Sequence, residues 1–523
     1  MLRVGALTLA CGAVQAGGTL TVCTDSAPQG FDIVQYETVD TEDAAGITLY
    51  DKLLAFKPGT TEVLPGLAER WEISADGLVY TLHLRKGVKF HTTAWFKPTR
   101  DFNADDVLWS INRVNDKTHP AHGVAKSGYP YWASMSMNEL IRSIEKLGDM
   151  TVRFTLTHAE APLLADLSMS AIGSVYSAEY ATQLQKAGKL DDLNTLPIGT
   201  GPFVFKSYQK DAVIRYAANR AYWGGAPKID TLVFAITPDP SVIVQRVKAG
   251  ECNVAALSVA QAASIEGVPN LRIVRGQPLM TTYLAPNAKH KFVGDKRFRE
   301  ALWLAIDKQA YIQSVYAGNA SAAVSFLPPG MWSRDAALKN RRDPDKAKQL
   351  VKASGYDGSE LLFIAASKDG NILRGVELLQ ADWARVGIKV RIQLFETGEL
   401  MKRSGRGEHD IALLSWFSDN GDPDNFLTPN LACAAVEGGG NKAQWCNKDF
   451  EALIDQARQT TDIKKRTELY VRAQRLLYDE VGLIPMVHRP QLTAVHKRVR
   501  GFAPTPFGGR DFRAVTIESV TIE

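Results

Sequence analysis

Eight consecutive residues, 418–425, hold the side chains of this chain best suited to bind a cation. Their order is Ser-Asp-Asn-Gly-Asp-Pro-Asp-Asn, so Asp419, Asp422 and Asp424 place three carboxylates within six positions. The content of Asp, Asn, Gly and Pro favours a loop over a helix or a strand. A carboxylate in such a loop can pair with a cation in a partly dry pocket, or all three can face water in a solvated turn.

The segments on either side of this loop favour the pocket. Residues 411–416 are apolar up to Trp416 and predict a buried strand, which would leave Asp419 at the mouth of that strand. Beyond the loop, Cys433 and Cys446 flank a Gly-rich stretch and are close enough in sequence to form a disulfide. Trp416 then either lines the pocket or packs in the core, and the sequence leaves both roles open.

Length and charge exclude some classes of protein. A chain of 523 residues exceeds what one hydrophobic core usually supports, so two or three domains are expected. With 61 basic and 57 acidic side chains, the formal net charge is +4, which argues against a general nucleic-acid binder. After the amino-terminal segment, no apolar run of the sequence approaches the roughly 20 residues of a membrane span.

The amino terminus has the pattern of an export signal. Arg3 precedes an apolar run over 4–14, and residues 14–16 offer a cleavage site, so we expect residues 1–16 to be removed. A buried first helix and lipidation at Cys11 are the alternatives. The pattern therefore predicts an exported, soluble chain in the periplasm.

Four cysteines remain once that segment is removed, and an even number in an oxidising compartment suggests two disulfides. The four are Cys23, Cys252, Cys433 and Cys446. Three pairings are possible, and pairing of the last two would close a short loop and stabilise the fold by about 3 kcal/mol. A zinc site is the alternative, but C-x-x-C and C-x-x-H spacings are absent from the sequence.

Hydrophobic periodicity predicts mixed α/β layers, because strand-like and helix-like segments alternate along the chain. Asn103 and Asp295 precede two of the predicted helices as candidate caps. Helices are predicted at 104–114, 296–316, 345–353, 371–386 and 463–478. Strands are predicted at 18–26, 68–74, 79–85, 151–157, 212–217, 230–237, 388–394 and 411–416.

The sequence has no motif typical of an enzyme or a metal site. A G-x-S-x-G elbow and a G-x-x-x-x-G-K-[ST] phosphate loop are both absent. The Gly-rich segment 199–202 ends in Pro202, which lacks a backbone donor, so we expect two chain segments to cross there. His119 and His122 flank Pro120, which makes a regular helix and a metal site unfavourable. The sequence predicts no cofactor, no metal and no catalysis.

Five segments of the chain carry the pattern of a known family: 67–91, 103–107, 197–203, 222–224 and 297–307. Together they resemble the family 5 extracellular solute-binding proteins, which serve ABC importers of peptides and nickel. The resemblance extends over essentially the whole mature chain. It is strongest to the dipeptide-binding members, with which residues 419–425 and the paired cysteines agree.

This resemblance implies the type II periplasmic-binding-protein fold (cluster C), an α/β fold of two lobes joined by a hinge, with an extra inserted domain. Ligand would be enclosed between domains I and III. It also implies disulfides Cys23–Cys252 within domain I and Cys433–Cys446 within domain III. The implied domains are 17–49, 197–277 and 490–523 for the discontinuous domain I, 50–196 for the insertion, domain II, and 278–489 for domain III.

The resemblance also implies a site. In the dipeptide-binding members, the carboxylate that matches Asp419 holds the α-ammonium of the peptide, and the aromatic side chain that matches Trp416 lines the same pocket. Those members hold the ligand's carboxylate with an arginine in a loop that here, at 366–371, is shorter and has no arginine at that position. Lys368 or Arg374 could take that role. Further candidate contacts are Tyr36, Glu37, Thr38, Thr282 and Tyr283.

The sequence therefore predicts an exported, monomeric capture protein that binds a dipeptide or short peptide and delivers it to an ABC permease, with no nucleic-acid partner. Side-chain pockets of the family are roomy and water-filled, so specificity should fall on the peptide termini. The alternatives are a binder of the same fold for haem, a nickel chelate or another amino-bearing solute, and an exported hydrolase.

Overall fold

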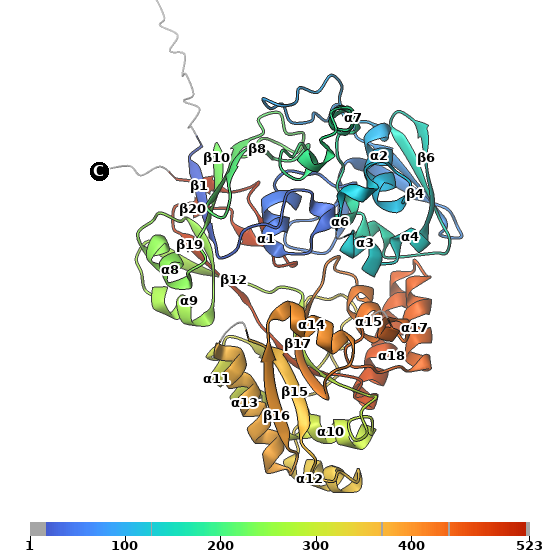
Figure 1. The fold of residues 1–523 in the computed structure, drawn as a ribbon, viewed down its shortest axis with the longest axis vertical. Coiled ribbons are helices and arrows are strands. Elements are labelled where there is room, and N and C mark those ends of the chain that lie inside the picture. Colours follow the sequence, from blue (N-terminus) through green and yellow to red (C-terminus); the bar gives the residue numbers. More distant parts are fainter. Residues whose placement is uncertain (1–16, 127, 368–369, 438–439, 519–523) are drawn as a thin grey trace, which may run out of the picture.

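The computed structural model describes residues 17–126, 128–367, 370–437 and 440–518. The predicted signal segment 1–16, and with it Cys11, lies outside the described residues, and so does Lys368. The described chain forms two bodies (Figure 1), an upper one that holds the blue and green segments together with the red carboxy-terminal strands, and a lower one that holds the yellow and orange segments.

The first lobe is built on a seven-stranded sheet that collects strands from three distant parts of the sequence. β1 lies inside this sheet, parallel to both of its neighbours, β10 and β11. The disulfide Cys23–Cys252 joins β1 to the segment before β11, with Cα atoms 5.7 Å apart. The strands, in sheet order, are β12 (Leu271–Gly276), β19 (Gln491–His496), β11 (Val254–Leu257), β1 (Thr19–Thr24), β10 (Thr231–Ile236), β9 (Val213–Ala218) and β8 (Phe203–Gln209).

An insertion in this lobe carries a four-stranded antiparallel sheet. In sheet order its strands are β4 (Ala68–Ile73), β5 (Val79–Leu84), β7 (Thr151–Leu156) and β6 (Ile141–Gly148). Helix α2 (Ala104–Asn115) packs on this sheet and begins with a capping box, in which the Asn103 side chain accepts from the helix and the Asp106 side chain accepts from the Asn103 amide. The predicted cap is therefore confirmed.

The second lobe has a six-stranded sheet whose inner strand β17 (Ile411–Phe417) is buried on both faces over residues 411–414. Ile411 and Leu413 pack into the core on one face, and Ala412 and Leu414 pack into the core on the other, as the period of two in a strand requires. The predicted buried strand is thus confirmed. The strands, in sheet order, are β14 (Ser321–Ala322), β18 (Ile484–His488), β13 (Met280–Pro286), β17, β15 (Leu361–Ala366) and β16 (Val390–Phe395).

Helices cover both lobes, and one predicted helix is wrong. The single helix expected over 296–316 is two helices, because Ile306 is extended and the Asp307 side chain caps a new helix by accepting from two backbone amides. The helices of the second lobe are α10 (Lys296–Ala305), α11 (Lys308–Tyr316), α12 (Pro344–Ala353), α13 (Gly370–Arg385), α14 (Thr397–Gly405), α15 (Asp424–Leu431), α16 (Ala434–Glu437), α17 (Lys448–Arg458) and α18 (Ile463–Glu480). The remaining helices are α1 (Val39–Thr41), α3 (Pro130–Ser134), α4 (Met137–Leu140), α5 (Leu163–Asp166), α6 (Ser170–Gly173), α7 (Ala178–Lys186), α8 (Pro240–Lys248) and α9 (Val259–Ile265).

The chain passes from one lobe to the other at two places, 277–279 and 489–490. β12 and β19 belong to the seven-stranded sheet, whereas the strands that adjoin them in sequence, β13 and β18, belong to the six-stranded sheet. Two adjacent crossings form a hinge about which lobes can close. The predicted α/β fold of two lobes is confirmed, while the exact domain bounds stay a prediction.

Three two-stranded sheets complete the fold. They are β2 (Leu54–Phe56) with β3 (Val63–Pro65), β20 (Val499–Arg500) with β23 (Thr516–Ile517), and β21 (Ala503–Pro504) with β22 (Arg510–Asp511). The Gly-rich segment at 199–202 is a crossing of two chain segments, as expected, since a Cβ on Gly199 would overlap the carbonyl oxygen of Leu49. Within the described ranges, none of the helices combines the length and the apolarity that a membrane crossing needs.

Candidate functional site

A cavity of about 1070 Å³ lies where the first lobe and its insertion face the end of β17. Pockets of this size are typical of small-molecule sites. One wall comes from the second lobe, through Phe417, Ser418 and Asp419, and the other walls come from the first lobe and the insertion. The side chains that matter below are Tyr36, Glu37, Thr38, Val39, Glu42, Lys52, Phe56, Tyr131, Phe417, Asp419, Phe507 and Arg513.

Asp419 is the carboxylate of the acidic run that faces this cavity. β17 ends at Phe417, and the next amide, of Ser418, donates to the carbonyl oxygen of Leu279 at 2.8 Å, which fixes the loop to the hinge. The Tyr131 hydroxyl donates to Oδ1 of Asp419 at 2.8 Å, and the Asn425 amide donates to Oδ2 at 3.2 Å. Both partners are neutral, and within the described part of the chain no ion pair involves Asp419.

The environment of Asp419 destabilises the negatively charged form of its carboxyl group. Burial raises the pKa of Asp419 to about 6, the hydrogen bonds from Tyr131 and Asn425 work against that rise, and the nearby carboxylates of Glu37 and Glu42 add to it. Burial also raises the pKa of Glu37, which lines the same cavity. An ammonium group entering here would find a desolvated carboxylate without a competing cation, which is a favourable arrangement for a charge-assisted hydrogen bond.

The other two carboxylates of the run, Asp422 and Asp424, form ion pairs within the protein. Asp422 lies 2.9 Å from a guanidinium nitrogen of Arg466, and both side chains are buried. Burial alone would lower the pKa of Arg466, but the charge of Asp422 raises it above its ordinary value. Asp424 begins α15 and lies 3.7 Å from Arg458, which also pairs with Glu160 of the insertion at 3.2 Å.

The loop that carries Asp419 is therefore held from several directions. Within the run, Asn420 donates its side-chain amide to the buried Asp166 of the insertion at 2.7 Å. Gly421 has a φ of +70° and packs so close to Thr61 that a side chain would collide there. The sequence predicted a loop here, and the structure shows that Asn420, through Asp166, and Asp419, through Tyr131, connect this loop to the insertion of the first lobe.

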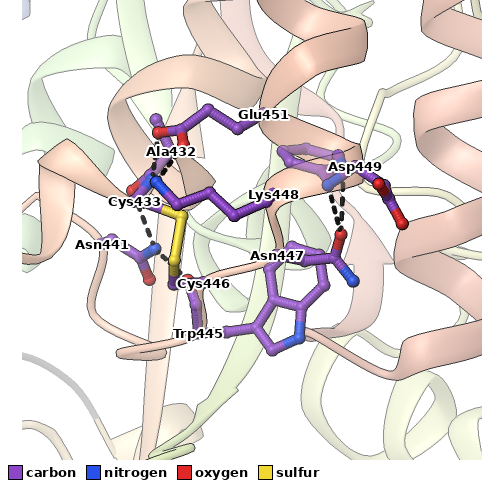
Figure 2. Close-up of a disulfide and its surroundings, with 10 residues drawn as sticks. Ala432, Cys433, Asn441, Trp445, Cys446, Asn447, Lys448, Asp449 and Glu451 are labelled. Atoms are coloured by element: carbon purple, nitrogen blue, oxygen red, sulfur yellow. Dashed lines mark hydrogen bonds and ion pairs between the residues drawn. A yellow bond between two sulfur atoms is a disulfide. The ribbon is translucent and has the colours of Figure 1, made fainter.

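A disulfide braces the segment after the run (Figure 2). Cys433 and Cys446 have Cα atoms 4.7 Å apart, and the Cys433 amide donates to Glu451 at 3.0 Å. Asn441 spans the loop they close, and its side-chain amide donates to the carbonyl oxygens of Ala432 and Trp445. Both predicted pairings, this one and Cys23–Cys252, are present in the structure.

The three candidate residues near the amino terminus lie at the cavity, and their role as ligand contacts stays a prediction. Tyr36, Glu37 and Thr38 line the cavity, and the Tyr36 hydroxyl accepts from the side-chain amide of Asn194 at 2.8 Å. Trp416 is half-buried at the end of β17 and packs against the core of the second lobe, and it is not among the side chains lining the cavity. Its core-packing role is the one this position favours.

Three other candidates lie away from the cavity. Tyr283 is buried in the core, where its hydroxyl donates to Asn430, and Thr282 is buried beside Ser415, with hydroxyl oxygens 3.0 Å apart. Arg374 is exposed on α13 and donates to the carbonyl oxygen of Ser314. None of the three lines the cavity.

Sequence reasoning missed the hydroxyl that holds Asp419 and the cations on the opposite walls. Tyr131 lies in α3, in an aromatic cluster around Pro130 that was the available signal. Lys52 and Arg513 both line the cavity, but Arg513 donates from Nε to both carboxylate oxygens of Asp511, at 3.0 and 2.9 Å. Lys52 makes a weaker contact, 3.4 Å from the Ser170 hydroxyl, and it could pair with a ligand carboxylate.

A two-lobed α/β protein with a cavity at its hinge and an unpaired carboxylate on the wall has the architecture of a solute-binding protein. The chain belongs to the bacterial extracellular solute-binding proteins, family 5, because residues 62–438 match the family described as "Bacterial extracellular solute-binding proteins, family 5 Middle".

Its similarity to individual members extends over nearly the whole chain. "Di/tripeptide-binding protein 4" of Pseudomonas aeruginosa is 48% identical over an alignment of 516 positions, which covers 97% of this chain and 96% of that protein. "Dipeptide-binding protein" of Escherichia coli is 42% identical over an alignment of 529 positions, which covers 99% of this chain and 98% of that protein. The crystal structure of a dipeptide-binding protein from Pseudoalteromonas in complex with Met-Leu has a TM-score of 0.85 at 35% identity, and the match covers 96% of this chain and 100% of that one.

Proposed function

We propose that this protein captures dipeptides or short peptides in the periplasm by their free amino terminus and presents them to an ABC permease. It acts by binding, as a monomer, without making or breaking a bond. Membership of the family and the peptide ligands named for its relatives support this proposal. The observation that carries it is the state of Asp419: a cavity-lining carboxylate that burial keeps at a raised pKa and that only neutral groups contact.

The physical reason for selecting an amino terminus is the cost of leaving Asp419 desolvated. A peptide ammonium offers three donors and a positive charge, so it compensates for that cost. An N-acetylated peptide brings one neutral donor and a bulky methyl group, and leaves the carboxylate without a counter-charge. Discrimination should therefore be strong at the amino terminus.

The test is isothermal titration with Ala-Ala and with N-acetyl-Ala-Ala, on the native protein and on Asp419→Asn. We expect Ala-Ala to bind the native protein at least about a hundredfold more tightly than the acetylated peptide, which corresponds to about 3 kcal/mol. In Asp419→Asn that ratio should collapse. Equal binding of the two peptides to the native protein would contradict the role of Asp419.

Native mass spectrometry of the purified protein gives an independent answer. A co-purified mass of two or three amino-acid residues supports the proposal. A bound haem or a bound nickel chelate would contradict the proposal and indicate a family member that binds that ligand instead. Release of free amino acids from Ala-Ala would indicate a hydrolase.

A further inference from the structure

Three phenylalanine rings from distant parts of the sequence form one wall of the cavity, called here the aromatic wall: Phe56, Phe417 and Phe507. Phe56 ends β2 in the insertion, Phe417 ends β17 in the second lobe, and Phe507 lies at the tip between β21 and β22. The rings of Phe56 and Phe507 are in contact, with centroids 4.6 Å apart and planes inclined by 40°. All three rings are half-buried, so each still presents apolar surface to the cavity.

The aromatic wall lies beside Asp419. Phe417 is the last residue of β17, Asp419 lies two residues further on in the loop that follows, and both line the cavity. The tip of β21 and β22 packs against this region, since a Cβ on Gly508 would lie 3.7 Å from a ring carbon of Phe417. A Cβ on Gly421, in the acidic run, would lie 3.5 Å from the ring of Phe507.

The surroundings of the wall are apolar as well. Val39 is 39% exposed, lines the cavity, and would contact the same Cβ on Gly508 at 3.9 Å. Aromatic and aliphatic carbon that remains exposed inside a cavity gains free energy when a ligand covers it. The side chain nearest to an ammonium bound at Asp419 is that of the first residue of the peptide, and the three rings line the same cavity as Asp419.

We propose that the aromatic wall is a subsite for an apolar side chain on the first residue of the ligand, so that the protein prefers peptides such as Leu-Gly over peptides such as Asp-Gly. This inference rests on the proposed function, because it takes the amino terminus to be bound at Asp419. The subsite adds a side-chain preference to the earlier expectation that specificity falls on the peptide termini. Because the three rings come from the insertion, the second lobe and the carboxy-terminal segment, an apolar first side chain also contacts both sides of the closing cleft.

The test compares Gly-Gly, Leu-Gly, Gly-Leu and Asp-Gly by isothermal titration. We expect Leu-Gly to bind about tenfold more tightly than Gly-Gly, which is the scale of burying one aliphatic side chain. Gly-Leu should lie close to Gly-Gly, and Asp-Gly should bind most weakly because its second carboxylate faces Glu37 and Glu42 as well as the rings. Equal binding of Leu-Gly and Gly-Gly, or a preference for Gly-Leu over Leu-Gly, would overturn the subsite.

Phe507→Ala and Phe507→Leu serve as the matched variants. The alanine variant should lower the ratio of Leu-Gly to Gly-Gly affinity to about twofold, and the leucine variant should restore most of it, because leucine replaces the lost apolar surface. A melting temperature close to that of the native protein shows that each variant is folded. An unchanged ratio in Phe507→Ala would overturn the role of the wall. If neither Gly-Gly nor Leu-Gly binds the native protein, the proposed function itself is wrong, whereas equal binding removes only the subsite.

Discussion

Two carboxylates of one loop, Asp419 and Asp422, stand three positions apart and have opposite surroundings. Asp422 is buried and ion-paired at 2.9 Å with Arg466, which is buried as well. Asp419 lines the cavity, accepts hydrogen bonds from Tyr131 and Asn425, and has no cation beside it in the residues that the structure describes. A buried charge that already has its partner contributes to the fold, whereas a desolvated charge that lacks one is available to a ligand.

This difference explains how one short run can both anchor its own loop and offer a carboxylate to a ligand. Asp422 and Asp424 connect the loop to α18 and α17 through arginines, and Asn420 connects it to the insertion. These contacts fix the loop on both sides of Asp419, whose own charge burial makes unfavourable. Pre-organisation of this kind lets a ligand gain the full electrostatic interaction without ordering the loop on binding.

The largest expected effect is loss of stability in Asp422→Asn. The substitution keeps the shape of the side chain but leaves the buried guanidinium of Arg466 without its counter-charge, which costs about 3–5 kcal/mol. The free energy of unfolding, measured with urea, should fall by that amount. Asp419→Asn is the matched control at the other end of the loop, and it should be at least as stable as the native protein because it removes a desolvated charge. An equal decrease in the free energy of unfolding in both variants would contradict the distinction between the two positions.

The next effect is the pH dependence of peptide binding. Because burial raises the pKa of Asp419 to about 6, the carboxylate gains a proton as the pH falls through 6, and affinity for an ammonium should fall by about tenfold between pH 7 and pH 5. The folded-state pKa is higher than that of an unfolded chain, so protonation of Asp419 stabilises the folded protein in the same range. Protonation of Asp419 therefore weakens peptide binding at pH 5 without unfolding the protein. Titrations at several pH values check this, and Asp419→Asn should lack the step near pH 6.

Much of the fold, but only part of the site, could be predicted from the sequence. The buried strand before the acidic run, the cap at Asn103 and both disulfides follow from local pattern or from the resemblance, and the structure has all three. The helix over 296–316 failed because its apolar spacing continues through Ile306, while the Asp307 side chain begins a second helix. Periodicity reports which faces are buried and is insensitive to one extended residue between two helices.

Which carboxylate faces the cavity could not be read from the loop itself. That outcome depends on Arg458 and Arg466, which lie more than thirty positions further along the chain, and on Tyr131 in the insertion, almost three hundred positions before Asp419. Composition marks the run as a polar turn with three equivalent acids. Only the tertiary contacts make the three acids different.

The smallest effect, and the sharpest probe of the comparison, is expected in Tyr131→Phe. The hydroxyl of Tyr131 donates to Asp419 and lowers the pKa of that carboxyl, so its removal leaves the charge with one hydrogen bond fewer. Peptide affinity at pH 7 should fall by about threefold to tenfold, the scale of one hydrogen bond to a charged group. The midpoint of the pH profile should move upward, which a purely structural role for Tyr131 would not produce.

Tyr129→Phe is the matched control for this variant. Tyr129 lies two residues away, and its hydroxyl donates to the carbonyl oxygen of His122 and not to the acidic run. It should therefore leave the midpoint of the pH profile where it is in the native protein. If Tyr131→Phe also leaves that midpoint in place, Tyr131 does not tune Asp419, and the neutral hydrogen bonds that set Asp419 apart from Asp422 have no influence on its charge.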